Sequence, residues 1–232
     1  MKSTPEDFSS FYSDAILAFD VLFVEKAYAQ FRPYFKGKSC LELGPATGYM
    51  TRLLIDDFEK VTVVEGSESL IAQIPNHVKL VKHFALFEEF EPGEQFDTII
   101  VNHVLEHIEH PVELLLRIKR WLKPAGSLIV GVPNSQSFHR LAAVKMGLLK
   151  TEDELNTRDI ALGHHRVYDL KLLKEHVLAA GYTITDEGGV FLKFLSNHQI
   201  EQQLNRNIID AYFELGKEFK ENSAEIYLIL TL

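Results

Sequence analysis

The sequence predicts an α/β fold built on a mostly parallel sheet, and two features of the chain support this prediction. Short apolar runs alternate with amphipathic helical patterns from residue 38 to residue 133, which is the pattern of strand–helix units in a parallel sheet. The first apolar run contains Leu41 and Leu43 and leads through a glycine-containing turn into a helical pattern. A strand, a glycine-rich turn and a helix in this order build a nucleotide site at the carboxyl end of the first strand.

The expected elements follow one another regularly up to residue 133. The run at 96–101 is mostly apolar, as in a strand that is covered on both faces of a parallel sheet. Pro111 begins a helical pattern that places Leu114, Leu115 and Ile118 on one face. Strands are predicted at 38–43, 61–65, 78–81, 96–101 and 127–132, and helices at 14–31, 48–57, 67–73 and 111–122.

The regular order stops after Pro133. A helical pattern at 137–149 and a polar segment up to residue 165 come first. Gly181 closes a helix at 169–180, since glycine readily adopts the left-handed conformation that ends helices. Beyond it we expect a strand at 182–195, a helix at 199–218 and a last strand at 224–231.

Length and composition narrow the classes of protein that fit. The 232 residues suit one α/β domain. The net charge of −9 argues against a broad nucleic-acid surface or a surface for anionic membranes. A single cysteine excludes an internal disulfide framework, and no apolar run approaches the roughly 18 residues of a membrane span. Residues 1–10 lack the apolar core of a secretion signal, so a cytoplasmic location is predicted, while the oligomeric state stays open.

The turn after the first predicted strand carries small residues at alternate positions. A dinucleotide-binding turn, G-x-G-x-x-G, would need glycine at 44, 46 and 49, but the sequence has Ala46 and Tyr49. The run E-L-G-P-A-T-G at 42–48 instead resembles motif I, E/D-x-G-x-G-x-G, of the class I S-adenosylmethionine (SAM) methyltransferases. That resemblance implies that SAM binds at Glu42, Gly44, Pro45, Ala46, Thr47 and Gly48.

Three further segments are similar to cofactor contacts of the same family. Glu65 ends the second predicted strand, where a carboxylate can accept hydrogen bonds from both ribose hydroxyls. Phe84 and Ala85 follow the third strand, and the resemblance implies that they border the adenine, with Phe84 stacking on it. Asn102 begins the segment N-H-V-L-E-H-I, which resembles the LEHI/V segment of many small-molecule methyltransferases, including the ubiquinone-biosynthesis O-methyltransferases.

These motifs together imply a fold and an activity. The resemblance implies a Rossmann-like α/β fold, with a seven-stranded sheet of order 3-2-1-4-5-7-6, strand 7 antiparallel and helices on both faces. Residues 1–232 would form one methyltransferase domain, with a helical cap at 1–35 and a lid-like insertion at 134–165. SAM would donate a methyl group to a small or medium polar acceptor, at oxygen, and leave as S-adenosylhomocysteine (SAH).

Two other functions stay open at this point. One is a methyltransferase that holds a divalent metal and acts on RNA or a peptide terminus. The net charge of −9 weighs against RNA, because affinity for a phosphate backbone needs lysine and arginine. The other is a SAM-binding protein without catalytic activity.

Histidines gather after the fourth predicted strand, and three roles stay open for them. As bases, His103 and His165 would take the proton of a hydroxyl acceptor, because an unperturbed imidazole titrates near neutral pH. We expect no metal. The alternative is a ligand set of His103, Glu106, His107 and His165, similar to the E-x-x-E-H…H ligands of small-RNA 2′-O-methyltransferases. If a helix follows Asn102, His103 and His107 share one face. In the third role, Glu106 and His107 are structural and orient loops.

Overall fold

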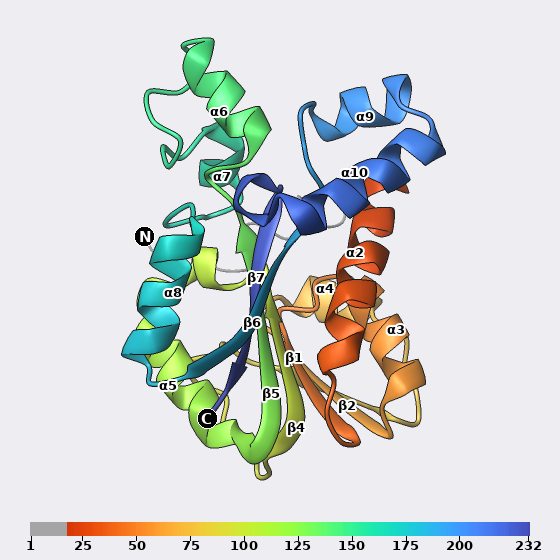
Figure 1. The fold of residues 1–232 in the computed structure, drawn as a ribbon. Coiled ribbons are helices and arrows are strands. Elements are labelled where there is room, and N and C mark those ends of the chain that lie inside the picture. The colour runs from red at the N-terminus through yellow and green to blue at the C-terminus, as the bar shows by residue number, and fades with distance from the viewer. Residues whose placement is uncertain (1–17) are drawn as a thin grey trace.

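The structure, a computed structural model, describes residues 18–232 and contains a seven-stranded sheet of order β3-β2-β1-β4-β5-β7-β6 (Figure 1). β7 pairs antiparallel with both β5 and β6, and the other neighbouring strands pair in parallel. The predicted strand order and the antiparallel strand 7 are therefore confirmed. The strands are β1 Ser39–Leu43, β2 Lys60–Glu65, β3 Leu80–Phe84, β4 Phe96–Asn102, β5 Leu122–Pro133, β6 Thr183–Val190 and β7 Glu225–Thr231.

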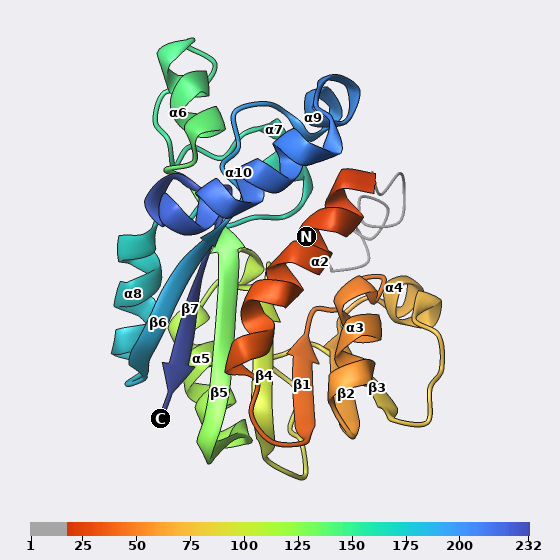
Figure 2. The same cartoon turned by 45° about the vertical axis from the view of Figure 1, so that its right-hand side comes forward.

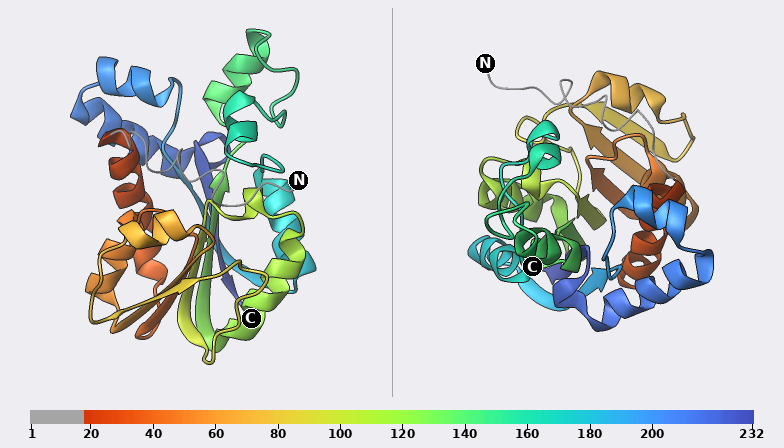
Figure 3. Two further views of the ribbon diagram at one scale, coloured as in Figure 1. Left: turned by 180° about the vertical axis from the view of Figure 1, so that it is seen from behind. Right: turned by 90° about the horizontal axis from the view of Figure 1, so that it is seen from above.

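Helices cover both faces of the sheet, as predicted (Figure 3). Side chains alternate across each strand, so Leu41 and Leu43 join one core while Cys40 joins the other. The core with Leu41 lies under α5 Pro111–Trp121 and α8 Leu170–Ala179. The core with Cys40 lies under α2 Ala18–Phe31, α3 Tyr49–Asp57, α4 Glu68–Gln73, α9 Asn197–Gln203 and α10 Arg206–Glu218.

The segment at 134–165 lies beyond the carboxyl end of β5 (Figures 1 and 2). It contains α6 Phe138–Lys145 and α7 Thr157–Ala161. A buried ion pair of 3.0 Å between Arg140 Nη1 and Asp159 Oδ2 joins these two helices. The segment has the position expected of a lid, and its role as a lid stays a prediction. Among residues 18–232, no helix has the length and apolar character needed to cross a membrane.

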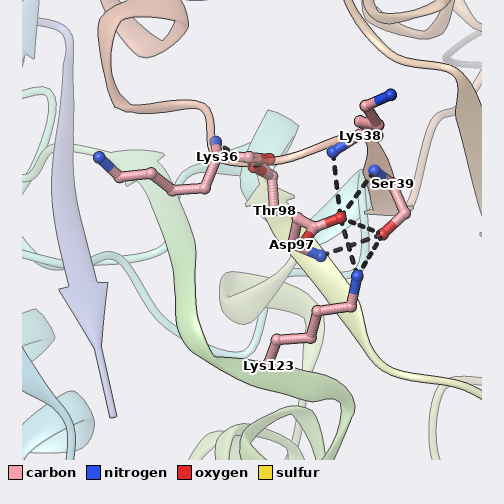
Figure 4. A network of polar contacts seen from close by, with 6 residues as sticks. All are labelled: Lys36, Lys38, Ser39, Asp97, Thr98 and Lys123. Carbon is pink, nitrogen blue, oxygen red and sulfur yellow. Dashed lines mark hydrogen bonds and ion pairs between the residues drawn. The ribbon is translucent and has the colours of Figure 1, made fainter.

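A polar network fixes the opposite, amino-terminal edge of the sheet (Figure 4). Asp97 of β4 accepts hydrogen bonds from the backbone of Lys38 and Ser39 at 3.0 Å each, and pairs with Lys123 of β5 at 2.9 Å. Gly37 has φ +55°, and a Cβ there would lie 2.1 Å from Asp97 Cγ. This carboxylate thus ties β1, β4 and β5 together at the edge away from the glycine turn.

Several predicted boundaries were wrong, for identifiable local reasons. The third strand starts at Leu80 rather than 78 and continues through Phe84, so Phe84 is a strand residue and not part of a turn. The predicted helix at 199–218 is two helices, because the Asn205 side chain caps a new helix by accepting from the backbone of Ile208. The leading helix is described from Ala18, and the rest of its predicted span, like residues 1–17 of the predicted cap, lies outside the described residues.

Predicted element boundaries also differ from the observed ones after β4 and in the second half of the chain. The residues after Asn102 form only a 3₁₀ turn, η2 Leu105–His107, so the helix that would align His103 with His107 is absent from this segment. α6 ends at Lys145, and the sixth strand ends at Val190 rather than 195. The fifth strand begins at Leu122, earlier than predicted. Short 3₁₀ turns also occur at η1 Arg32–Tyr34 and η3 Lys220–Asn222.

Candidate cofactor and acceptor site

The turn between β1 and α3 has a left-handed backbone at three alternate positions. Gly44, Ala46 and Gly48 have φ angles of +67°, +47° and +80°. Glycine adopts such angles without strain, and alanine is the smallest residue for which these angles are strained. Gly48 precedes α3 and makes no side-chain cap, so the first N–H groups of the helix have no side-chain acceptor there. The turn therefore presents backbone donors at the carboxyl end of β1.

Glu65 at the end of β2 lies directly against this turn. Its Oε2 atom accepts a hydrogen bond from the backbone N–H of Ala46 at 3.2 Å, and its Oε1 atom accepts one from Ser67 at 3.0 Å. The side chain is 7% exposed. The structure thus brings the predicted ribose-binding carboxylate to the predicted glycine turn, although the two come from different strands.

Glu42 lies beneath the turn, where it is nearly inaccessible to solvent. It accepts a hydrogen bond of 2.6 Å from the Thr51 hydroxyl of α3. Burial raises the pKa of Glu42 to about 7, and the nearby charge of Glu65 adds to this rise. The carboxyl group therefore links β1 to α3 beneath the turn. Its predicted contribution to cofactor binding would come from the shape and the charge that it gives the turn.

The other predicted cofactor residues lie at the ends of the neighbouring strands. Phe84 ends β3 and is 60% exposed, and Ala85 donates a backbone hydrogen bond to Glu65 at 3.1 Å. Asn102 ends β4, and its buried Oδ1 atom has no hydrogen-bond partner in the part of the chain that the structure describes. Pro45 and Thr47 are buried within the turn itself. All predicted cofactor residues thus meet at one edge of the sheet, at the carboxyl ends of β1, β2, β3 and β4.

His103 lies between two buried carboxylates. Its Nε2 atom is 2.7 Å from Glu225 Oε2, and its Nδ1 atom is 3.4 Å from Glu106 Oε1. Burial alone would lower the pKa of His103, but the charge of Glu225 and the contacts with both carboxylates outweigh burial and raise it to about 10. Because the imidazole is 43% exposed, solvent screens part of this attraction. A protonated imidazole cannot accept a proton, so this geometry argues against the predicted role of His103 as a base.

A second group brings Glu106 together with two other histidines. The possible ligand atoms of Glu106, His107 and His164 all lie within 4.8 Å of one another, and the two imidazole rings are 4.6 Å apart. Among residues 18–232, neither carboxylate oxygen of Glu106 has a hydrogen-bond partner, although the side chain is 1% exposed; its closest charged neighbour is His103 Nδ1 at 3.4 Å from Oε1. His164, which the sequence analysis did not single out, thus occupies the place expected for His165.

His165 itself is not part of this group. It is exposed, and its backbone N–H donates to the carbonyl of Glu106 at 2.8 Å. His164 Nδ1 lies 3.5 Å from Asp159 Oδ1 in α7, which also pairs with Arg140. The sequence signal at this position is the adjacent pair of histidines, which does not by itself say which of the two lies beside Glu106.

Comparison with known proteins identifies the family of this chain. A family described as a methyltransferase domain matches residues 20–187. The fold and the matched domain define a SAM-dependent methyltransferase of class I, and the chain belongs to this methyltransferase-domain family.

Individual relatives are distant but cover most of the chain. A malonyl-[acyl-carrier protein] O-methyltransferase from Halalkalibacterium halodurans is 21% identical over 212 residues, which cover 79% of this chain and 74% of the relative. A ubiquinone biosynthesis O-methyltransferase from Rhizobium etli is 26% identical over 191 residues, 78% of this chain and 73% of the relative. The solved structure of the N-methyltransferase NodS from Bradyrhizobium japonicum, in complex with SAH, has a TM-score of 0.62 at 12% identity and 98% coverage of both chains.

Proposed function

We propose that this methyltransferase transfers the methyl group of SAM to an oxygen atom of a small or medium polar acceptor. The observation that carries the proposal is the contact between Ala46 and Glu65, which joins a glycine turn to a carboxylate at the carboxyl edge of the sheet. Both relatives compared above are named as O-methyltransferases, and each matches more than three quarters of the chain, which favours oxygen over nitrogen. The cytoplasmic location stays a prediction.

The residues of the turn fit SAM better than they fit a pyrophosphate cofactor. Glu65 places a carboxylate directly against the turn, and the Glu42 carboxyl group is buried beneath it. This arrangement suits a ligand with a cationic ammonium and sulfonium, and the Glu65 charge would repel a pyrophosphate. When bound, SAM supplies a methyl group on a sulfonium ion. The residues that would hold it are Glu42, Gly44, Pro45, Ala46, Thr47, Gly48, Glu65, Phe84, Ala85 and Asn102.

The proton of a hydroxyl acceptor needs a base other than His103. With its two carboxylate neighbours, His103 stays protonated at neutral pH and would instead supply a fixed positive charge. His165 lies at the same edge of the sheet and is exposed, so it remains the candidate base. A carboxylate acceptor would need no base, because it carries no proton to remove.

A second candidate is a methyltransferase that depends on a divalent metal. The buried Glu106 carboxylate, which lacks hydrogen bonds and lies beside His107 and His164, favours it. Two imidazoles and one carboxylate are ligands that zinc and iron(II) accept. Asp159 lies against His164 Nδ1 as an outer partner of the kind that orients metal-bound histidines. This set differs from the predicted one, because His164 replaces His165.

One assay separates these candidates. The purified protein is incubated with SAM and a panel of hydroxy acids, carboxylic acids and amines, and SAH formation and product mass are measured before and after dialysis against a chelator. O-methylated product that forms equally in both samples supports the first candidate. Activity lost on chelation and restored by zinc supports the second. Methylation confined to nitrogen acceptors would contradict the proposed oxygen specificity.

A further inference from the structure

The backbone around Lys193 is held in a fixed and strained conformation just beyond β6. Phe191 has φ +63°, a left-handed angle that is a genuine outlier for a bulky residue. Its carbonyl accepts a hydrogen bond from Ala224 at 2.7 Å, and the Lys193 carbonyl accepts one from His139 of α6 at 3.0 Å. Gly216 of α10 allows close approach, because a Cβ there would lie 2.3 Å from Phe191 N. Strain of this kind persists where the surroundings enforce it, and it is common at ligand-binding positions.

Lys193 lies at the same edge of the sheet as the glycine turn. β6 is antiparallel to β7, which is antiparallel to β5, so β5 and β6 run in the same direction and end at the same edge. The stacked rings of Phe138 and Phe194, 5.2 Å apart, hold the residues after β6 against α6. Figures 1 and 2 show α6, α7 and α9 gathered beyond this edge. Lys193 is therefore part of the region where an acceptor would approach the cofactor.

The charge of Lys193 is not balanced by a direct partner. Its ammonium group makes no hydrogen bond or ion pair with any residue from 18 to 232. Burial and the positive charge of Arg158 in α7 lower the pKa of Lys193 to about 8, so the group is still mostly protonated at neutral pH. Asp20 of α2 opposes this shift, but its carboxylate already accepts a hydrogen bond of 2.6 Å from Asn197.

The pKa of His139 is also affected by the positive charges in this region. Burial, followed by the charges of Lys193 and Arg140, lowers its pKa to about 3 against the opposing charge of Asp159, so the imidazole is neutral. Its buried Nδ1 atom has no hydrogen-bond partner among the described residues. A chain with a net charge of −9 repels anions in general, so a local excess of positive charge at this edge is informative about the ligand.

We propose that Lys193, with Arg158 beside it, binds a carboxylate group of the acceptor, so that the substrates of this methyltransferase are organic acids. This inference rests on the proposed function and names the substrate class for the same site. Lys193, Arg158 and Asp20 together leave one net positive charge. A carboxylate monoanion neutralises that charge, whereas a phosphate dianion would exceed it. In the complex the ammonium gains a charged partner of the kind that it lacks among residues 18–232.

The test uses the full chain saturated with SAH and titrated with sodium benzoate, with the neutral isostere benzamide, and with inorganic phosphate. Calorimetry measures affinity, and NMR of ¹³C-methylated lysines reports the Lys193 signal. We expect benzoate to bind at least tenfold more tightly than benzamide or phosphate and to shift the Lys193 signal. Lys193→Met should lower benzoate affinity at least tenfold, and Lys193→Arg should retain most of it. Lys150→Met, which changes an exposed lysine of the segment at 134–165, should leave the affinity unchanged.

The outcomes separate this inference from the proposed function. Benzoate affinity that survives in both Lys193→Met and Arg158→Gln overturns the inference, as does equal binding of benzamide, preference for phosphate, or no response to benzoate. SAH affinity should stay within twofold of wild type in all variants, which also shows that they fold. A wild-type chain that fails to bind SAH overturns the proposed function instead.

Discussion

His103 Nε2 lies 2.7 Å from Glu225 Oε2, and this contact joins the end of β4 to the start of β7. β5 lies between these two strands in the sheet, and it has Gly131 at the crossing point. A Cβ at Gly131 would lie 2.0 Å from Asn102 Oδ1 and 2.9 Å from Glu225 Oε1. Only glycine leaves room for the Asn102 and Glu225 oxygens. The contact between His103 and Glu225 therefore depends on Gly131 of β5, the strand between the two that it joins. The pair raises the pKa of the histidine that the sequence predicts to act as a base.

The Glu225→Gln variant should lower the pKa of His103 from about 10 toward the 6.5 of a free imidazole. A pKa raised by folding means that the pair stabilises the fold fully below pH 6.5 and that this stabilisation is lost as pH rises through about 10. At pH 7 we expect the variant to lose about 1–2 kcal/mol, a value reduced for the partial exposure of His103.

Urea unfolding at pH 7 and pH 10, with NMR titration of His103, measures both effects. The wild-type free energy of unfolding should fall more between these pH values than that of the variant. Glu221→Gln, an exposed neighbour, serves as the control. A His103 pKa near 6.5 in the wild-type chain would contradict the ion pair.

Gly48→Val should abolish SAH binding. The position has φ +80°, and a Cβ would lie 3.1 Å from the Ile74 side chain. A left-handed backbone costs a residue with a Cβ about 1–2 kcal/mol, so the turn would shift. Gly147→Val is the matched control, because Gly147 has φ +73° with nothing within 4 Å and lies outside the turn. Calorimetry with SAH should find binding only in the control, and equal affinity in both would place the cofactor elsewhere.

Glu65→Ala should weaken SAH binding by about 1–3 kcal/mol, the range for lost hydrogen bonds to a charged group. Part of that loss comes from the turn itself, because Ala46 also loses its acceptor. Circular-dichroism melting of the SAH-free variant separates this effect from the loss of contact with the ligand. Glu68→Ala, an exposed carboxylate nearby, should bind SAH normally. Wild-type affinity in Glu65→Ala would exclude the predicted ribose contact.

Asp97→Asn should destabilise the fold without changing SAH affinity, because the network in Figure 4 lies at the amino-terminal edge of the sheet. Burial alone would raise the pKa of Asp97, but Lys123 and hydrogen bonds from Ser39 and Lys38 outweigh it and hold the pKa well below its usual range. A lowered pKa gives stabilisation that is present above the unfolded value of about 3.9 and is lost as pH falls below it.

At pH 7 we expect Asp97→Asn to lose about 1–3 kcal/mol, with the gap to wild type closing in acid. Glu59→Gln should change little, since Glu59 pairs with Lys38 on the surface. Urea unfolding at pH 7 and pH 3 measures this, and a gap that stays constant with pH would contradict the assigned role of Asp97.

The sequence predicts the sheet well because each strand is a local pattern. Apolar runs predicted the bounds of β1, β2 and β4 to within one or two residues. Local patterns do not contain the strand order, which came from the resemblance to the methyltransferase family. The glycine turn and Glu65 could be paired in advance, since the ends of neighbouring parallel strands meet at one edge.

The histidine cluster could not be predicted in the same way. Glu225 lies 122 residues beyond His103 in the chain, and only the antiparallel pairing of β7 brings them together. The choice between His164 and His165 depends on how α7 ends, with His164 N donating to the Asp159 carbonyl at 2.9 Å. His103 itself has a φ angle of +54°, which is incompatible with a helix in its segment.

The binding of SAH and NAD to the purified chain tests most directly whether this protein binds SAM. By mass action, SAH at 100 times its dissociation constant should raise the free energy of unfolding by about 2.7 kcal/mol, while NAD at the same concentration should have no measurable effect. Calorimetry should give one SAH site per chain. Tighter binding of NAD, or an unfolding free energy that SAH leaves unchanged, would contradict the account.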